Sequence, residues 1–152
     1  MTKILVCFDG SKCSMDALDY AIEIAQKEHN PELIIIHVMQ DLKLTSNQMY
    51  YLTFSKGKLV DEIVEKAKQE SSQILEKINK KVDKYKEKFK IETKIFETGS
   101  SVVGGVIEYA DKEEIDLIVI GTRGNTGFKK LLIGSTAQGV VTYAHCPVLV
   151  VK

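Results

Sequence analysis

The chain has 152 residues, of which 44% are hydrophobic and 28% are charged. These values are ordinary for a globular protein and argue against disorder, and the length fits one domain covering residues 1–152. Lys plus Arg and Asp plus Glu each number 21, so the formal net charge is zero and no overall field attracts nucleic acid.

The termini and the cysteines exclude further classes of protein. No apolar run approaches the ~18 residues that a membrane helix needs, and the amino terminus has no cleavage site. We therefore expect a cytoplasmic protein with no membrane partner. The cysteines are Cys7, Cys13 and Cys146, an odd number without a C-x-x-C pair. This spacing argues against a disulfide framework and against a zinc site, so we expect buried, reduced thiols and no metal ligands.

The first predicted unit is a strand followed by a helix. Residues 3–8 predict a strand that is apolar from Ile4 to Phe8. Asp9 then starts a turn into a helix over about residues 12–27, with Ser11 or Ser14 as its cap. Asp9 would therefore lie at the carboxyl edge of the sheet, where open α/β sheets bind ligands. The alternative is that Asp9 only caps the turn or the helix.

The second unit begins with a buried strand over residues 32–39, and Val38 ends near the same edge as Asp9. Residues 40–54 have no firm period and could form a lid or a plain surface excursion. A helix over about residues 57–89 follows. Its lysines alternate with glutamates, which favours a solvated face over a nucleic-acid surface.

The second half repeats the alternation of strands and helices. Residues 90–96 predict an edge strand. The helix that follows contains Gly104 and Gly105, each of which costs about 1 kcal/mol of helix stability relative to alanine. Glycines kept at this cost indicate that another part of the chain packs closely against them. Residues 116–120 and 147–152 predict two more strands. The order predicts an α/β fold, Rossmann-like, with a five-stranded parallel sheet and helices on both faces.

A glycine motif follows the strand at residues 116–120. The glycines Gly121, Gly124 and Gly134 stand before Ser135 with the spacing G-x2-G-x9-G-S. Gly121 and Gly124 would allow positive φ and close approach of a ligand. If Gly124 and Gly134 serve only the ligand, replacing either one by valine should leave the fold intact. The helix start at Gly134 and Ser135, with Ser135 as N-cap, favours an anion such as phosphate. An ordinary surface loop is the alternative.

Four segments of the chain resemble the universal stress protein family: residues 4–11, 34–38, 116–121 and 146–151. The resemblance implies the strand order 3-2-1-4-5 and an ATP site of the family's nucleotide-binding branch. Adenine and ribose would lie toward Phe8, Asp9 and Val38. Mg²⁺ would accompany the nucleotide and sit mainly on phosphate oxygens.

The motif and the resemblance together define the predicted nucleotide site. Its residues are Phe8, Asp9, Val38, Gly121, Arg123, Gly124, Gly134, Ser135 and Thr136. Lys129 and Lys130 are further candidate cations for the phosphates.

The favoured function is an adenine-nucleotide-binding protein of the stress response that binds rather than turns over ATP, because no acid–base or nucleophile–base pair can be assembled. One alternative is a nucleotide-dependent enzyme on the same scaffold, with slow hydrolysis or transfer. Another is a structural dimer module that has lost nucleotide binding. The short apolar edge at residues 148–151 predicts a homodimer, and in the family this strand pairs across a two-fold axis.

Overall fold

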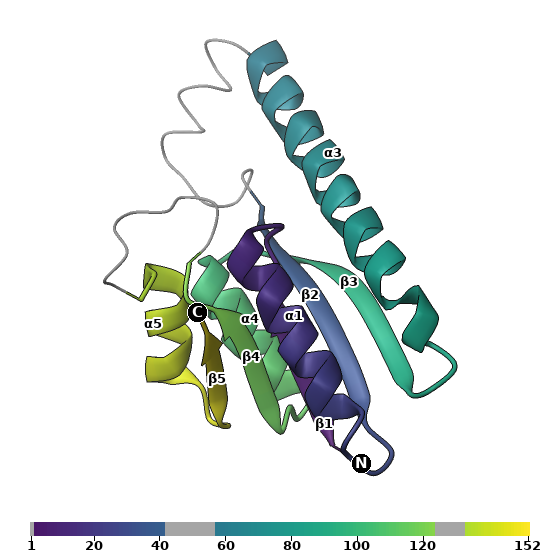
Figure 1. The fold of residues 1–152 in the computed structure, drawn as a ribbon. Coiled ribbons are helices and arrows are strands. Elements are labelled where there is room, and N and C mark those ends of the chain that lie inside the picture. Colours follow the sequence, from purple (N-terminus) through teal and green to yellow (C-terminus); the bar gives the residue numbers. More distant parts are fainter. Residues whose placement is uncertain (1, 42–56, 124–132) are drawn as a thin grey trace.

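The computed structural model describes residues 2–41, 57–123 and 133–152, with only the backbone described at 57–60. Strands and helices alternate along these residues, as predicted (Figure 1). Most of the 40–54 segment, together with Gly124, Lys129 and Lys130, lies outside the described residues. The elements are β1 Lys3–Cys7, α1 Lys12–Ala25, β2 Glu32–Gln40, α3 Gly57–Val82, the 3-10 turn η1 Asp83–Tyr85, β3 Lys90–Thr98, α4 Val102–Lys112, β4 Leu117–Gly121, α5 Ser135–Tyr143 and β5 Val148–Val151.

The strands form one parallel sheet in the order β3-β2-β1-β4-β5, which confirms the predicted order. β1 is central, with Leu5 opposite Ile34 of β2 and opposite Ile118 of β4. The chain leaves β1 for α1 on one face of the sheet and leaves β4 for α5 on the other face. A crevice therefore opens between these two connections at the carboxyl edge of the sheet.

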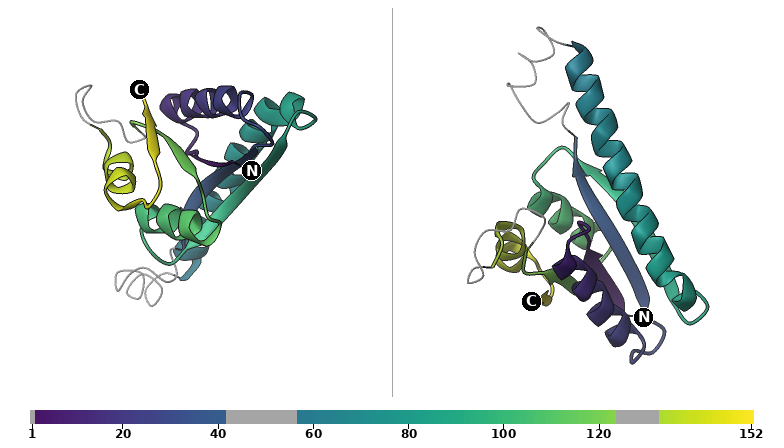
Figure 2. Two further views of the ribbon diagram at one scale, coloured as in Figure 1. Left: turned by 90° about the horizontal axis from the view of Figure 1, so that it is seen from below. Right: turned by 45° about the horizontal axis from the view of Figure 1, so that its top comes forward.

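Helices cover both faces of the sheet (Figure 2). α1 and α3 pack over one face, where Ile4 and Val6 of β1 point, and α4 and α5 pack over the other face, where Leu5 points. Successive side chains of a strand alternate between faces, so a strand covered on both sides needs an uninterrupted apolar run. Along the described residues, no helix combines the length and apolarity needed to cross a membrane.

Two helix ends refine the sequence analysis. Ser11 is the N-cap of α1, and its Oγ accepts a hydrogen bond from the Ser14 N–H at 3.2 Å. α3 ends at Val82, earlier than the predicted residue 89. Tyr85 and Phe89 still pack against the core, in a 3-10 turn and the turn after it, so the apolar pattern continues beyond the helix.

The glycine pair in α4 lies where neighbouring elements approach closely. A Cβ at Gly105 would lie 2.8 Å from Cγ2 of Thr98 and 2.9 Å from Cγ1 of Val38. A Cβ at Gly104 would meet the hydroxyl of Ser100. The predicted close packing is confirmed, and it accounts for glycines that weaken the helix itself.

Gly121 has a packing role rather than the predicted conformational one. Among the described glycines, Gly10 has positive φ, at 83°, whereas Gly121 ends β4 in ordinary strand geometry. A Cβ at Gly121 would lie 2.6 Å from the carbonyl carbon of Cys13. The expectation of positive φ at Gly121 was therefore wrong, and the missing side chain lets the first turn of α1 pack directly on β4.

We predict that Gly121→Ala lowers the free energy of unfolding by about 2 kcal/mol, because the new methyl group must displace backbone rather than a flexible side chain. Urea denaturation measures the change. Gly99→Ala is the matched control, since Gly99 is exposed and lacks positive φ, and it should shift stability by no more than about 0.5 kcal/mol. Equal effects of the two substitutions would contradict the packing role of Gly121.

Candidate functional site

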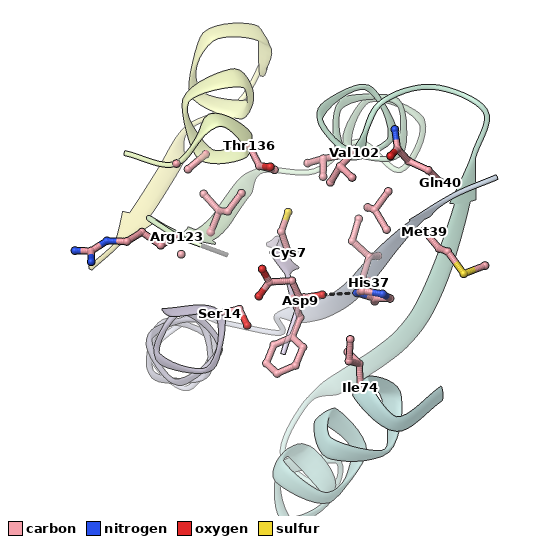
Figure 3. Close-up of a pocket in the computed structure, with 18 of the residues that line it drawn as sticks. Cys7, Asp9, Ser14, His37, Met39, Gln40, Ile74, Val102, Arg123 and Thr136 are labelled. Carbon is pink, nitrogen blue, oxygen red and sulfur yellow. Dashed lines mark hydrogen bonds between the residues drawn. The ribbon is translucent and has the colours of Figure 1, made fainter. Parts of the chain in front are cut away.

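A cavity of about 500 Å³ opens at the carboxyl edge of the sheet, at the crevice between the connections of β1 and β4 (Figure 3). Its walls come from the ends of β1, β2 and β4 and from α1, α3, α4 and α5. The described residues of the predicted site all line it: Phe8, Asp9, Val38, Gly121, Arg123, Gly134, Ser135 and Thr136. Gly124 lies outside the described residues.

The turn after β1 brings Asp9 to the cavity. The Phe8 N–H donates to the carbonyl oxygen of Ile36 at 2.9 Å, so Phe8 is still attached to β2. Gly10 follows with φ of 83°, a conformation that other residues adopt only with strain. One carboxylate oxygen of Asp9 accepts the Ser11 N–H at 2.9 Å. Asp9 therefore stabilises the turn, as the alternative interpretation proposed, and also lines the cavity.

The connection after β4 is anchored at both of its described ends. The Thr122 N–H donates to the carbonyl oxygen of Val151 at 2.7 Å, and the Thr122 carbonyl accepts the Gly134 N–H at 2.6 Å. The Ser11 hydroxyl also donates to the Arg123 carbonyl at 3.2 Å, which ties the start of α1 to this connection. The described residues on the two sides of 124–132 therefore lie next to each other, with Gly134 bonded to Thr122.

Gly134 has a structural requirement of its own. A Cβ at this position would lie 2.8 Å from the carbonyl oxygen of Thr122. The condition attached to Gly134→Val, that the glycine serves only the ligand, is therefore not met, because the backbone at Gly134 lies directly against the backbone at Thr122.

The start of α5 presents backbone N–H groups to the cavity. The N-cap is Gly134, without a side-chain cap, so the prediction that Ser135 is the N-cap was wrong by one residue. The first intrahelical bond runs from the Gln138 N–H to the Gly134 carbonyl at 2.9 Å. Ser135, Thr136 and Ala137 precede this bond, and all three line the cavity. Their amides carry the positive end of the helix dipole, which favours an anion.

The charged side chains around the cavity are distributed unevenly. Asp9 and Glu70 line it, and so does Arg123. In Figure 3 the guanidinium of Arg123 extends away from Asp9 and Cys7, while Thr136 lies across the cavity from Asp9. The electropositive part of the wall is therefore formed by the amides of α5 more than by the Arg123 side chain.

Sequence reasoning missed much of the cavity wall. Applying the carboxyl-edge rule to all of β2 would have found His37, Met39 and Gln40, which follow the last residue that pairs with β1. Ala67 and Ile74 were indistinguishable from core positions of a long amphipathic helix. Thr122 lies within the glycine motif but was not named as a site residue. No sequence signal marked the others, which are Cys7, Ser14, Ile36, Glu70, Ser71, Val102, Val106, Ile120 and Ala137.

Comparison with known proteins identifies the family of this chain. The universal stress protein family matches residues 1–152. The chain belongs to this family. Universal stress protein MJ0531 of Methanocaldococcus jannaschii is 36% identical over 150 residues, covering 99% of this chain and 81% of the relative. Universal stress protein YxiE of Bacillus subtilis is 33% identical over 150 residues, covering 99% of this chain and 98% of the relative.

Solved universal stress proteins share the fold. The Archaeoglobus fulgidus protein in complex with dAMP has a TM-score of 0.69 at 20% identity, covering 100% of this chain and 98% of the other. A universal stress protein in complex with cAMP has a TM-score of 0.60, and an Arabidopsis thaliana family protein with AMP bound has a TM-score of 0.64. At an identity of 20%, a likeness in structure establishes a common architecture.

The cysteines of this universal stress protein are free thiols, each partly buried rather than fully buried as expected. Cys7 lies in the cavity wall, where desolvation, and secondarily the carboxylate of Asp9, raises the pKa of its thiol from 9.0 to about 12. Within the described parts of the chain, no cluster of three or more His, Cys, Asp or Glu could hold a metal ion. The cavity thus contains a protonated thiol, which is a poor nucleophile.

We predict that iodoacetamide at pH 8 alkylates Cys7 of the folded protein at least about tenfold more slowly than Cys7 of the urea-unfolded protein, because little thiolate forms below its pKa. Mass spectrometry of the Cys7 peptide measures both rates. The pKa of the Cys7 thiol is higher in the folded protein than in the unfolded one. The neutral thiol therefore contributes to the free energy of unfolding below about pH 9, and this contribution is lost as the pH rises toward about 12. Equal rates in the two states would refute the assignment.

Proposed function

We propose that this universal stress protein binds an adenine nucleotide in the cavity at the carboxyl edge of the sheet. The supporting observation is that the start of α5, with its backbone amides, and the Asp9 carboxylate line the same cavity on opposite sides. Its volume of about 500 Å³ falls in the range typical of small-molecule sites. Family members that hold dAMP, cAMP and AMP add support.

The polarity of the cavity wall suggests how the nucleotide would be oriented. A phosphate is attracted to the first amides of α5 and is repelled by the Asp9 carboxylate. The base and ribose carry hydrogen-bond donors that a carboxylate accepts. We therefore propose that they lie toward Phe8, Asp9 and Val38. The phosphates would lie toward the α5 start and the motif residues Gly121, Arg123, Gly124, Gly134, Ser135 and Thr136.

We propose ATP with Mg²⁺ as the physiological form. The α5 amides and the backbone near Gly121 and Arg123 would hold the phosphates. Mg²⁺ binds oxygen ligands and commonly takes most of them from substrate phosphates and water, so the cation would be held mainly by ATP itself. When bound, it would neutralise phosphate charge beside the protein. The cavity wall fits this division of roles, because its described carboxylates belong to separate elements, Asp9 after β1 and Glu70 in α3.

We further propose a binding role rather than efficient turnover, in the stress response and in the cytoplasm. A binding protein of this kind would report nucleotide levels through its occupied and empty states. A binding role needs no nucleophile, which agrees with the raised pKa that keeps the Cys7 thiol in the cavity wall protonated.

We predict that Asp9→Asn weakens Mg-ATP binding about tenfold, because the amide replaces a charged acceptor of the base or sugar. The asparagine carbonyl can still accept the Ser11 N–H, so the turn should persist and thermal stability should change little. Isothermal titration calorimetry measures the affinity, and Asp83→Asn in the 3-10 turn is the matched control. No heat with wild-type protein would refute ATP binding, and unchanged affinity in Asp9→Asn would show that the base and sugar lie elsewhere.

We also propose a homodimer formed through β5. β5 pairs with β4 on one side, and Val148, Leu149 and Val150 remain partly exposed. α5 packs against β5 and exposes Val141 and Tyr143 at 50% and 65%. A short apolar edge beside exposed apolar side chains is a surface that proteins commonly cover.

Light scattering at micromolar protein should therefore give particles of about twice the 17.0 kDa of one chain, because paired β5 edges would satisfy the outward backbone groups. Particles of one chain mass across that concentration range would contradict the proposed dimer.

A further inference from the structure

Both backbone polar groups of Phe8, its N–H and its carbonyl, are bonded to residues of β2. The Phe8 N–H donates to the Ile36 carbonyl at 2.9 Å. The Phe8 carbonyl contacts Nδ1 of His37 at 2.9 Å, the bond drawn as a dashed line in Figure 3. A carbonyl only accepts, so Nδ1 of His37 is the donor in this bond.

The bond from His37 extends the attachment of β1 to β2 beyond the regular strand pairing. That pairing ends with Cys7 opposite Ile36. The chain next reaches Asp9 and then Gly10 in its positive-φ conformation. Asp9 therefore stands between two restraints, the Phe8 carbonyl held by His37 and the Ser11 N–H held by its own carboxylate at 2.9 Å.

We infer that His37 is a positioning residue for the nucleotide site, acting through the Phe8 carbonyl to set where the Asp9 carboxylate lies. This inference rests on the proposed function, because it assigns Asp9 to the base or sugar. His37 is half-buried and also lines the cavity, and a rotation of its ring away from Phe8 would leave the Phe8 carbonyl without this donor.

Two substitutions separate the hydrogen bond from the volume of the ring. His37→Leu keeps an apolar side chain of similar size and removes the donor. His37→Asn restores an N–H donor at nearly the position of Nδ1. His29→Leu is the control for losing a histidine, since His29 is exposed at the opposite end of β2. Thermal melts would verify that each variant is folded.

The first readout needs no ligand. Amide hydrogen exchange at Ser11 reports whether its N–H remains bonded to Asp9. We expect exchange at Ser11 to be about tenfold faster in His37→Leu and within about threefold of wild type in His37→Asn and His29→Leu. Unchanged exchange in His37→Leu, or exchange in His37→Asn as fast as in His37→Leu, would overturn the positioning role.

The second readout is a double-mutant cycle with Asp9. His37→Leu should weaken Mg-ATP binding about tenfold in the wild-type background and less than about threefold in the Asp9→Asn background, because it acts through that side chain. Equal losses in both backgrounds would overturn the inference. If wild-type protein binds no ATP, the proposed function fails, and Ser11 exchange still decides whether His37 positions Asp9.

Discussion

The rest of the structure depends on the burial of β1 on both faces. Ile4, Leu5 and Val6 are fully inaccessible to solvent, with neighbouring strands on both sides and helices above and below. A central strand of this kind requires helices on both faces of the sheet, and right-handed crossovers can supply them only if the connections diverge from the middle. The cavity lies where they diverge, so the same constraint that builds the core also creates this crevice.

Close backbone contacts then give the crevice its shape. Gly121 allows α1 to touch β4, and Gly134 allows the chain to return beside Thr122. These contacts bring the α1 start and the α5 start to opposite sides of one opening. Gly121 and Gly134 of the glycine motif therefore join two helix starts to the sheet edge, a use separate from the phosphate binding that the motif predicts. From sequence alone, close packing and close approach of a ligand explain a glycine equally well. The short distances from a Cβ at each position to neighbouring backbone atoms are what indicate packing.

The sequence was a good guide to the fold because its evidence is local. The apolar runs at β1, β2 and β4 and the edge pattern at β3 depend on which faces are buried, and they led directly to the parallel sheet. The sequence did not predict contacts between residues that lie far apart along the chain. Tyr85 and Phe89 continued a helical apolar pattern although α3 had ended, because a core-facing residue in a tight turn has the same composition as one in a helix.

The same limit applies to the candidate site. Phe8, Asp9 and Val38 could be assigned to the sheet edge from their positions at strand ends, supported by family resemblance. The roles of Gly121 and Gly134 depend on Cys13 and Thr122, and no sequence spacing reports those approaches. The position of His37 at the sheet edge could have been predicted, but its bond could not, because the partner is the backbone carbonyl of Phe8 in the turn after β1, which has no side-chain signature.

The long helix α3 connects the core to the cavity as one rigid element. Ile78 and Val82 are buried in the core, while Ala67 and Ile74 line the cavity further along the same helix, whose far end extends past the sheet (Figure 1). Ala67 lies about 16 Å from Ile78 at ~1.5 Å per residue, so a tilt of about 5° at the core would move this wall by about 1.4 Å. A tilt of α3 about Ile78 and Val82 would therefore change the width of the cavity, although these two side chains lie outside its wall.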